Sequence, residues 1–212
     1  MGKRLFLALS PDEESRRRIE RYAESLHGAL KAYQPRWIKP ELYHLTLHFF
    51  GDVEESALSL LEESFSALSG SLSHPLLTLE ELLFLPSLRK PRVLTLRFSS
   101  EPAGAFGPIL EKVQTDAQGD PKPWLPHLSL ARFKDHRANR WPTAVLKPKQ
   151  DFPKPPKLWF EPTSIELMES FLSPAGPRYE IRKSFRFAPK NFALAIAQKP
   201  FHFALHSKIV IL

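Results

Sequence analysis

The sequence predicts an α+β fold built from a duplicated unit, in which two histidine-bearing strands meet at one catalytic cleft. Residues 43–51 alternate polar and apolar side chains, which is the period of a half-buried strand. A near-copy occurs at residues 126–133, so that both segments read His-Leu-hydroxyl-Leu, beginning at His44 and His127. Because residues two positions apart share one face of a strand, each copy presents an imidazole and a hydroxyl together.

Each copy belongs to a longer order of elements: a strand, a helix, an extended segment with proline and tryptophan that we call the lead-in, and the histidine strand. In the first unit we expect a strand over 5–9, a helix from Ser10 to residue 30, a lead-in at 35–40, the His44 strand, a helix over 54–68 and a strand over 75–85. Ser10 as N-cap and Pro11 at the first helical position support the helix start. The apolar residues of this helix recur at amphipathic spacing.

The same order of elements begins again at residue 92. We expect a strand over 92–98, a helix over 102–118, a lead-in at 121–124, the His127 strand, a strand over 164–170, a turn at 174–177 and a partner strand over 179–187. Residues 134–157 are basic and rich in proline, which predicts a loop. Trp37 and Trp124, one in each lead-in, are expected to act as anchors in or near the core. The repetition is weak in sequence and clear in plan.

Composition places the chain among ordinary globular proteins and excludes several kinds of site. Apolar residues make up 42% and charged residues 25% of the 212 residues, the usual range. Because the sequence has no cysteine, disulfides, thiolate metal sites and cysteine nucleophiles are excluded, and a reducing compartment is compatible. No apolar run approaches the roughly 20 residues of a membrane span. We therefore expect a cytoplasmic protein without a membrane partner.

The net charge of +7 has two interpretations. A basic excess favours polyanionic partners such as RNA, because lysine and arginine contacts to phosphates dominate such binding. The same excess can simply keep a protein soluble. Charge alone does not separate the two.

Two histidines can cleave a phosphodiester without a metal ion. The ordinary pKa of imidazole, about 6.5, lets its neutral and protonated forms coexist near neutrality. One histidine can take a proton from the attacking oxygen while the other gives one to the leaving oxygen. Thr46 and Ser129 can donate hydrogen bonds to phosphate oxygens, and Arg132 can offset the developing charge.

Neighbouring residues of the motifs have open roles. A regular strand would point Arg132 away from His127, so only a twist, a bulge or a strand end would bring it to the site. His48 would share the face of His44, although single strand histidines are more often surface or satisfied residues. Phe49 and Phe50 can offer a base-stacking surface, while core packing is the commoner use of at least one.

In this order the motifs resemble the 2H phosphoesterase superfamily, and specifically its bacterial and archaeal RNA 2′,3′-cyclic phosphodiesterases, also called 2′-5′ RNA ligases. The resemblance is carried by residues 5–9, 36–40, 44–47, 50–51, 91–94, 126–132 and 169–179. It spans roughly residues 3–187, and the paired histidine motifs are its most specific part.

The resemblance implies a bilobal, pseudo-symmetric α+β fold in which two mainly antiparallel sheets face a central basic cleft with helices packed outside. It implies a monomer that hydrolyses RNA 2′,3′-cyclic phosphate ends to 2′-phosphates without metal, ATP or another cofactor. The reverse-type reaction would join such an end to a 5′-hydroxyl. By the same resemblance, His44 would protonate the leaving 3′ oxygen and His127 would activate water. Thr46 and Ser129 would hold the phosphate, with Arg132 assisting.

The sequence departs from the family pattern in places. Ser129 stands where threonine is more usual, which keeps the hydroxyl, and the stretch before Pro86 is rich in leucine where the family tends to show glycine and phenylalanine. Residues 188–212 match nothing in the family. We therefore expect one bilobal domain over 1–187 and an unassigned extension over 188–212.

Two other functions stay open on the sequence. A module that binds RNA ends without chemistry would use the basic charge and the aromatic residues alone. A phosphodiesterase of small cyclic nucleotides would keep the histidine pair and change the substrate. The near-symmetry of the repeat also leaves open which histidine is the acid.

Overall fold

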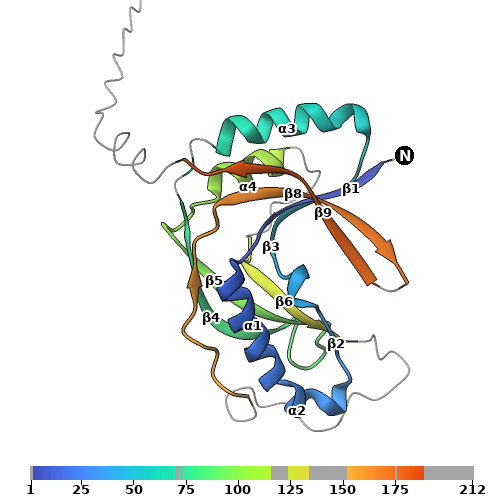
Figure 1. Ribbon diagram of the computed structural model, residues 1–212, viewed down its shortest axis with the longest axis vertical. Coiled ribbons are helices and arrows are strands. Elements are labelled where there is room, and N and C mark those ends of the chain that lie inside the picture. The colour runs from blue at the N-terminus through green and yellow to red at the C-terminus, as the bar shows by residue number, and fades with distance from the viewer. Residues whose placement is uncertain are drawn as a thin grey trace, which may run out of the picture.

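The computed structural model describes residues 2–69, 72, 74–115, 124–133, 152–174 and 176–188 (Figure 1). In chain order the elements are β1 (Lys3–Leu9), α1 (Glu13–Ser25), α2 (His27–Leu30), the 3-10 turn η1 (Lys31–Tyr33), β2 (Arg36–Trp37), the 3-10 turn η2 (Pro40–Leu42), β3 (Leu45–Val53), α3 (Glu55–Ser69), β4 (Leu76–Leu85), β5 (Val93–Glu101), α4 (Gly107–Thr115), β6 (His127–Arg132), β7 (Trp159–Phe160), β8 (Ser164–Ser173) and β9 (Gly176–Arg186). The expected order of strands and helices is therefore confirmed over these ranges.

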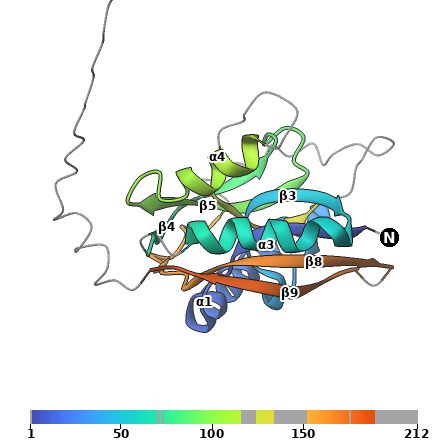
Figure 2. The ribbon, with the colours of Figure 1, turned by 90° about the horizontal axis from the view of Figure 1, so that it is seen from above.

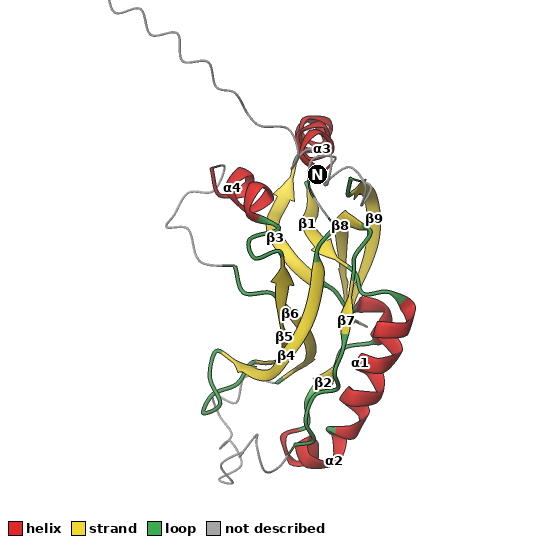
Figure 3. Ribbon diagram, turned by 90° about the vertical axis from the view of Figure 1, so that its left-hand side faces the viewer, coloured by secondary structure: helices red, strands yellow, loops and turns green. Residues whose placement is uncertain are grey.

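One curled antiparallel sheet organises the fold (Figure 3). Its strand order is β7-β4-β5-β6-β3-β1-β8-β9, and β2 pairs with β6. The histidine strands β3 and β6 are neighbours at the centre, joined by the pair Leu45 and Leu128. The expectation of an α+β fold is confirmed. The two separate sheets implied by the family resemblance are instead two halves of one sheet, because this central pair bridges them.

The third strand of each repeat pairs in the opposite half of the sheet. β4 follows β3 and α3 in the chain, yet it pairs with β5. In the same way β8 comes after β6 and pairs with β1. The short strand β2, in the first lead-in, pairs with β6 of the second repeat. The duplicated units are thus interleaved, and neither half of the sheet is a continuous piece of chain.

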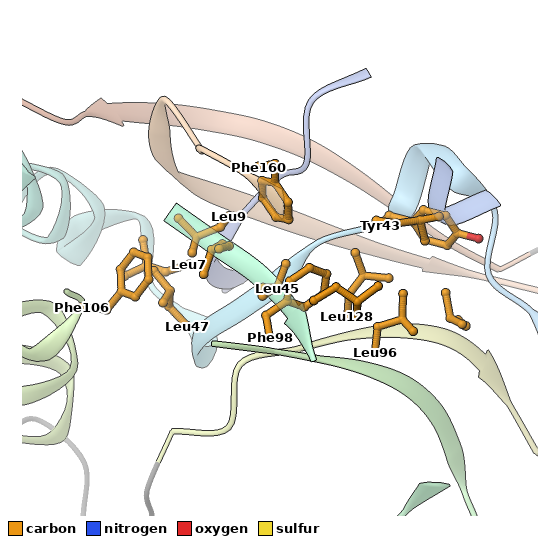
Figure 4. Close-up of a cluster of buried hydrophobic side chains, with 14 of the residues drawn as sticks. Leu7, Leu9, Tyr43, Leu45, Leu47, Leu96, Phe98, Phe106, Leu128 and Phe160 are labelled. Atoms are coloured by element: carbon orange, nitrogen blue, oxygen red, sulfur yellow. The ribbon is translucent and has the colours of Figure 1, made fainter. Parts of the chain in front are cut away.

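Helices and strands share one large core on one face of the sheet. Alternate residues of β1, Leu5, Leu7 and Leu9, are fully buried there with apolar residues of α1, α3 and α4. Figure 4 shows part of this cluster, in which leucines of β1, β3 and β6 meet aromatic rings. Burying one such side chain contributes about 1.5–3 kcal/mol. This face therefore fixes the register of the central strands.

The helices take two positions along the sheet. α3 and α4 contact each other at one end, while α1 and α2 lie toward the other (Figure 1). Seen from above, α3 runs across the front of the molecule (Figure 2). The other residues of β1, Phe6 and Ala8, point away from the large core and form a small apolar cluster with Met168. This second face of the sheet carries the motif residues.

The first helix starts two residues later than expected. Its N-cap is Asp12, whose Oδ1 accepts a hydrogen bond of 2.8 Å from the Ser15 amide. Ser10 is not the cap, because its hydroxyl donates to Glu166 at 2.7 Å. The helix also breaks at Leu26, between α1 and α2.

None of the helices in the described ranges is long and apolar enough to cross a membrane. The helix expected over 102–118 is shorter than predicted at its start, since α4 begins at Gly107. Residues 116–118, most of the loop expected over 134–157, and the extension beyond residue 188 lie outside the described residues.

Candidate active site

The central strand pair brings the two histidine motifs together. Leu45 and Leu128 are fully buried partners in the antiparallel ladder between β3 and β6. Each motif histidine immediately precedes one of these leucines, and each hydroxyl residue immediately follows one. Since neighbours on a strand point to opposite faces, both histidines and both hydroxyls lie on the face away from the large core. Continuing the register by one residue sets Thr46 opposite His127, and His44 opposite Ser129.

Both imidazoles make the same kind of hydrogen bond, each to a backbone carbonyl two residues earlier. Nδ1 of His44 lies 2.8 Å from the carbonyl oxygen of Leu42, and Nδ1 of His127 lies 2.8 Å from that of Leu125. A carbonyl only accepts, so in each ring the proton sits on Nδ1 and is donated to the residue two positions earlier. Nε2 is therefore the nitrogen left to exchange a proton at each motif.

The lead-ins hold the motifs in a crossed arrangement. The first lead-in binds the second histidine strand, because the Ile38 amide donates to the Leu130 carbonyl at 2.8 Å and Trp37 pairs with Ala131. The second lead-in binds the first histidine strand, because the Trp124 indole donates to the Thr46 carbonyl at 2.9 Å. The tryptophans are anchors, as expected, and each one anchors the other unit's motif.

A bulge in β6 turns Arg132 toward the histidines. Thr95 pairs with Ser129 and Leu94 pairs with Ala131, which leaves Leu130 as the extra residue. A bulge of this kind shifts the alternation of side chains by one position. Leu130 and Ala131 are both fully buried, and Arg132 is exposed on the face of His127. The structure therefore places Arg132 on the site face through one of the routes anticipated from the sequence.

A bulge at the equivalent position of β3 corrects the expectation for His48. Thr46 pairs with Ala8 and His48 pairs with Leu7, so Leu47 is the extra residue. Cross-strand partners share a face, and His48 therefore points to the core side with Leu7. Its ring lies 4.8 Å from that of Phe50. The expectation that His48 shares the face of His44 is wrong, because it assumed an unbroken alternation.

The same bulge decides which of the two phenylalanines faces the core. Phe50 packs against the large core, and its ring lies 5.9 Å from that of Phe65. Phe49 pairs with Phe6 on the site face and is 46% exposed. The Arg4 guanidinium lies over the Phe49 ring, 4.7 Å from its centroid. One phenylalanine is thus a core residue, while the other offers an exposed ring beside a cation.

Aromatic neighbours enclose His44. Its ring centroid lies 5.1 Å from that of Phe6 and 5.3 Å from that of Tyr179, which meets it edge-on. Burial is the main cause that lowers the pKa of His44 below its ordinary value of 6.5. The hydrogen bond to Leu42 opposes this shift, and the positive charges of His127 and Arg132 add to it. The free protein therefore favours neutral His44.

A pocket of about 200 Å³ opens beside His44. Its lining comes from the β1–α1 connection, α1, η2 and the two residues after it, β8 and β9. It consists of Ser10, Arg16, Glu41, Leu42, Tyr43, His44, Glu166, Met168, Tyr179 and Ile181. The sequence did not indicate Phe6, Tyr179, Ser10 or Glu166 as residues of the site. They carry no motif, and only the fold of β1 against β8 and β9 brings them to His44. Within the described ranges, no three histidine, aspartate or glutamate side chains are grouped as a metal site would require.

Comparison with known proteins finds relatives and solved structures that cover most of this chain. Residues 9–95 match the family described as LigT like Phosphoesterase. The chain is 28% identical over 191 residues to the RNA 2′,3′-cyclic phosphodiesterase of Methanothermobacter thermautotrophicus, covering 88% of this chain and 100% of the relative. It is 26% identical over 189 residues to the protein of the same name from Archaeoglobus fulgidus, with 86% and 99% covered.

Solved structures share the fold. The crystal structure of E. coli LigT complexed with 3′-AMP superposes with a TM-score of 0.67 at 21% identity, covering 89% of this chain and 100% of LigT. A protein of Thermus thermophilus superposes with a TM-score of 0.65 at 22% identity, covering 87% of this chain and 97% of that protein. Residues 9–95 are thus similar to the LigT-like phosphoesterases, and the curated relatives and solved structures extend the likeness over most of the chain.

Proposed function

We propose that the protein hydrolyses the 2′,3′-cyclic phosphate ends of RNA to 2′-phosphates, with His44 and His127 as the acid–base pair. The observation that carries the proposal is the matched pair of imidazoles on one face of β3 and β6. Each donates Nδ1–H to a backbone carbonyl and keeps Nε2 for proton exchange. Relatives that bear the name RNA 2′,3′-cyclic phosphodiesterase support the choice of substrate.

The two histidines divide the reaction between them. A water oxygen attacks phosphorus on the side opposite the 3′ oxygen, and Nε2 of His127 takes a proton from that water. The P–O3′ bond then breaks, and protonated His44 gives its Nε2 proton to the 3′ oxygen. The products are a 2′-phosphate and a 3′-hydroxyl. With a 5′-hydroxyl in place of water, the same transfers would form a 2′-5′ linkage.

Three side chains act on the phosphate. Thr46 and Ser129 donate hydrogen bonds to its non-bridging oxygens, and Arg132 stabilises the negative charge that develops there. The phosphate also acts on His44. Burial lowers the pKa of His44 in the free protein, and a bound anion favours the protonated form that the acid role needs.

Features outside the histidine pair favour RNA over a small cyclic nucleotide. Phe49 presents an exposed ring on the site face with Arg4 above it. Nucleotides stack on such rings in single-stranded RNA recognition, and a nearby arginine contributes cation–π and phosphate contacts. A mononucleotide would leave this surface unused.

An oligonucleotide with a 2′,3′-cyclic phosphate end, assayed with a chelator present, tests the proposal. We expect a 2′-phosphate product, and a loss of about 10²–10⁴-fold in rate for His44→Ala and for His127→Ala, with an unchanged circular dichroism spectrum. Full activity in either variant contradicts the proposal. Salt-sensitive binding without turnover would instead indicate a binding module, and equal turnover of a cyclic mononucleotide would indicate the smaller substrate.

A further inference from the structure

The pocket beside His44 lies on the side of the phosphate where the nucleoside must be. In the proposed hydrolysis, His44 protonates the 3′ oxygen, which belongs to the ribose of the cyclic end. The attacking water stands on the opposite side, with His127. The ribose and its base therefore extend from phosphorus toward His44, and His44 itself lines the pocket.

The pocket suits a base better than a second phosphate. Two carboxylates, Glu166 and Glu41, are part of its lining and would repel a phosphate. Met168, Tyr179 and Ile181 supply apolar surface for a flat ring, and Ile181 is 56% exposed although it is apolar. The lining thus combines a stacking surface with acceptors of hydrogen bonds.

Glu166 has a free acceptor in this pocket. The Ser10 hydroxyl donates to Oε2 of Glu166 at 2.7 Å, and within the described part of the chain Oε1 has no hydrogen-bond partner. Glu166 lies on the site face, because its strand partner is Ala8, which in turn pairs with Thr46. Its carboxylate therefore has capacity to accept hydrogen bonds from a ligand.

The base that fits an acceptor-only group is guanine. Its Watson–Crick edge places two adjacent donors, N1–H and the 2-amino group, where a carboxylate can accept both. Adenine and cytosine each place a ring acceptor beside their amino group, and uracil has one N–H between two carbonyls. Arg16 is also in the lining. Its Nη1 donates to Glu13 and its Nη2 to the Pro11 carbonyl, so it contributes positive charge on the side where a base carbonyl would lie.

We propose that Glu166, held by Ser10, selects RNA ends whose terminal nucleoside is guanosine. This inference rests on the proposed hydrolysis and adds a specificity to it. Glu166 would bind the base and take no part in proton transfer. Replacing Glu166 should therefore change the ratio of the kcat/KM values for two RNA ends that differ in their base. It should not change the proton transfers that both ends share.

The test compares two oligonucleotides that differ only in the terminal base, guanine or adenine, each with a 2′,3′-cyclic phosphate. We expect kcat/KM to favour the guanine end by about tenfold or more, since hydrogen bonds to charged groups carry discrimination of that order. An inosine end lacks the 2-amino group and should fall between the two. Glu166→Gln should bring the guanine-to-adenine ratio close to one.

A matched control lies on the other half of the sheet. Glu81 is also a strand carboxylate, and it is held by Arg97 at 2.7 Å. Arg97 is the strand partner of His127, so Glu81→Gln perturbs the opposite side and should keep the base preference. Equal kcat/KM values for the guanine and adenine ends of the unaltered protein overturn the inference, as does a preference retained in Glu166→Gln. Failure to hydrolyse any cyclic end refutes the proposed function itself, so the two failures are distinguishable.

Discussion

His44 and His127 occupy the same place in two copies of one motif, yet their surroundings differ. His44 is enclosed by Phe6 and Tyr179, and burial lowers its pKa. His127 is more open, and its strand partner is the cation Arg97. The backbone contact that orients each ring is the same, with Nδ1 2.8 Å from a carbonyl oxygen. The shared orientation thus goes with the matching motif sequences, while the residues around each ring allow different roles.

The bulges of β3 and β6 occupy the same place in the two motifs but present different residues. Leu47 and Leu130 are the extra residues, each three positions after its histidine. In both strands the shift returns the fifth residue after the histidine to the site face. That residue is Phe49 in the first unit and Arg132 in the second. One backbone device therefore presents a stacking ring on one side and a cation on the other.

The largest expected effect separates the acid role of His44 from the base role of His127. It uses a cyclic end whose bridging 3′ oxygen is replaced by sulfur. A thiol, with a pKa of about 8.5, leaves without help from an acid. We expect His44→Ala to lose about 10²–10⁴-fold on the oxygen substrate and to recover most of that loss on the sulfur substrate. His127→Ala should stay impaired on both, because water still needs a base.

The measurement is single-turnover rate at saturating protein for both substrates. Recovery in His127→Ala, and not in His44→Ala, would reverse the assignment of acid and base. It would also place the ribose on the side of His127 and remove the argument for the guanine pocket.

Replacing Arg132 tests whether the cation that the bulge of β6 presents is needed for the reaction. Arg132→Met should lower kcat by about 10²-fold, the usual cost of losing a group that stabilises developing charge. The substitution removes only the charge from an exposed position, so thermal stability should change little. Arg186→Met removes a charge from another exposed strand position, on β9, and should keep kcat within about twofold. An active Arg132→Met variant would show that the bulge in β6 serves packing alone.

The smallest effect concerns stability. The folded protein lowers the pKa of His44 below 6.5, so the unfolded chain binds more protons as the pH falls through this range. The free energy of unfolding should therefore decrease on going from pH 7.5 to pH 5.5. Urea unfolding of His44→Gln should show a smaller decrease over the same interval. Identical decreases in both proteins would mean that folding does not lower the pKa of His44.

Sequence alone predicted much of the fold because alternation and helical spacing are local signals. The order of strands and helices, the pairing of the motifs and the anchoring tryptophans all followed from them. Alternation failed beyond Leu47, where a bulge reversed the faces of His48 and Phe49. In the second unit a signal was present in the sequence, because the adjacent apolar residues Leu130 and Ala131 break the alternation, and both are buried in the structure.

The rest of the candidate site depends on contacts between distant segments. The sequence around Ser10 predicts a helix cap. In the structure β8 places Glu166, 156 residues away along the chain, beside the Ser10 hydroxyl. Tyr179 is one of many strand residues in the sequence. In the structure β9 places its ring edge-on against that of His44. No local pattern distinguishes such residues, because their role comes from register across β1, β8 and β9.

The interleaving of the two repeats has a consequence for how the protein acquires its site. β4 and β8 complete sheet halves begun by the other repeat, and each lead-in is fastened to the other repeat's strand. The imidazoles can meet only after segments from both ends of the domain have come together. Such long-range closure is slow compared with local folding. Synthesis of the first repeat alone therefore cannot form the acid–base pair, because β6 and the strands that complete the sheet come from the rest of the chain.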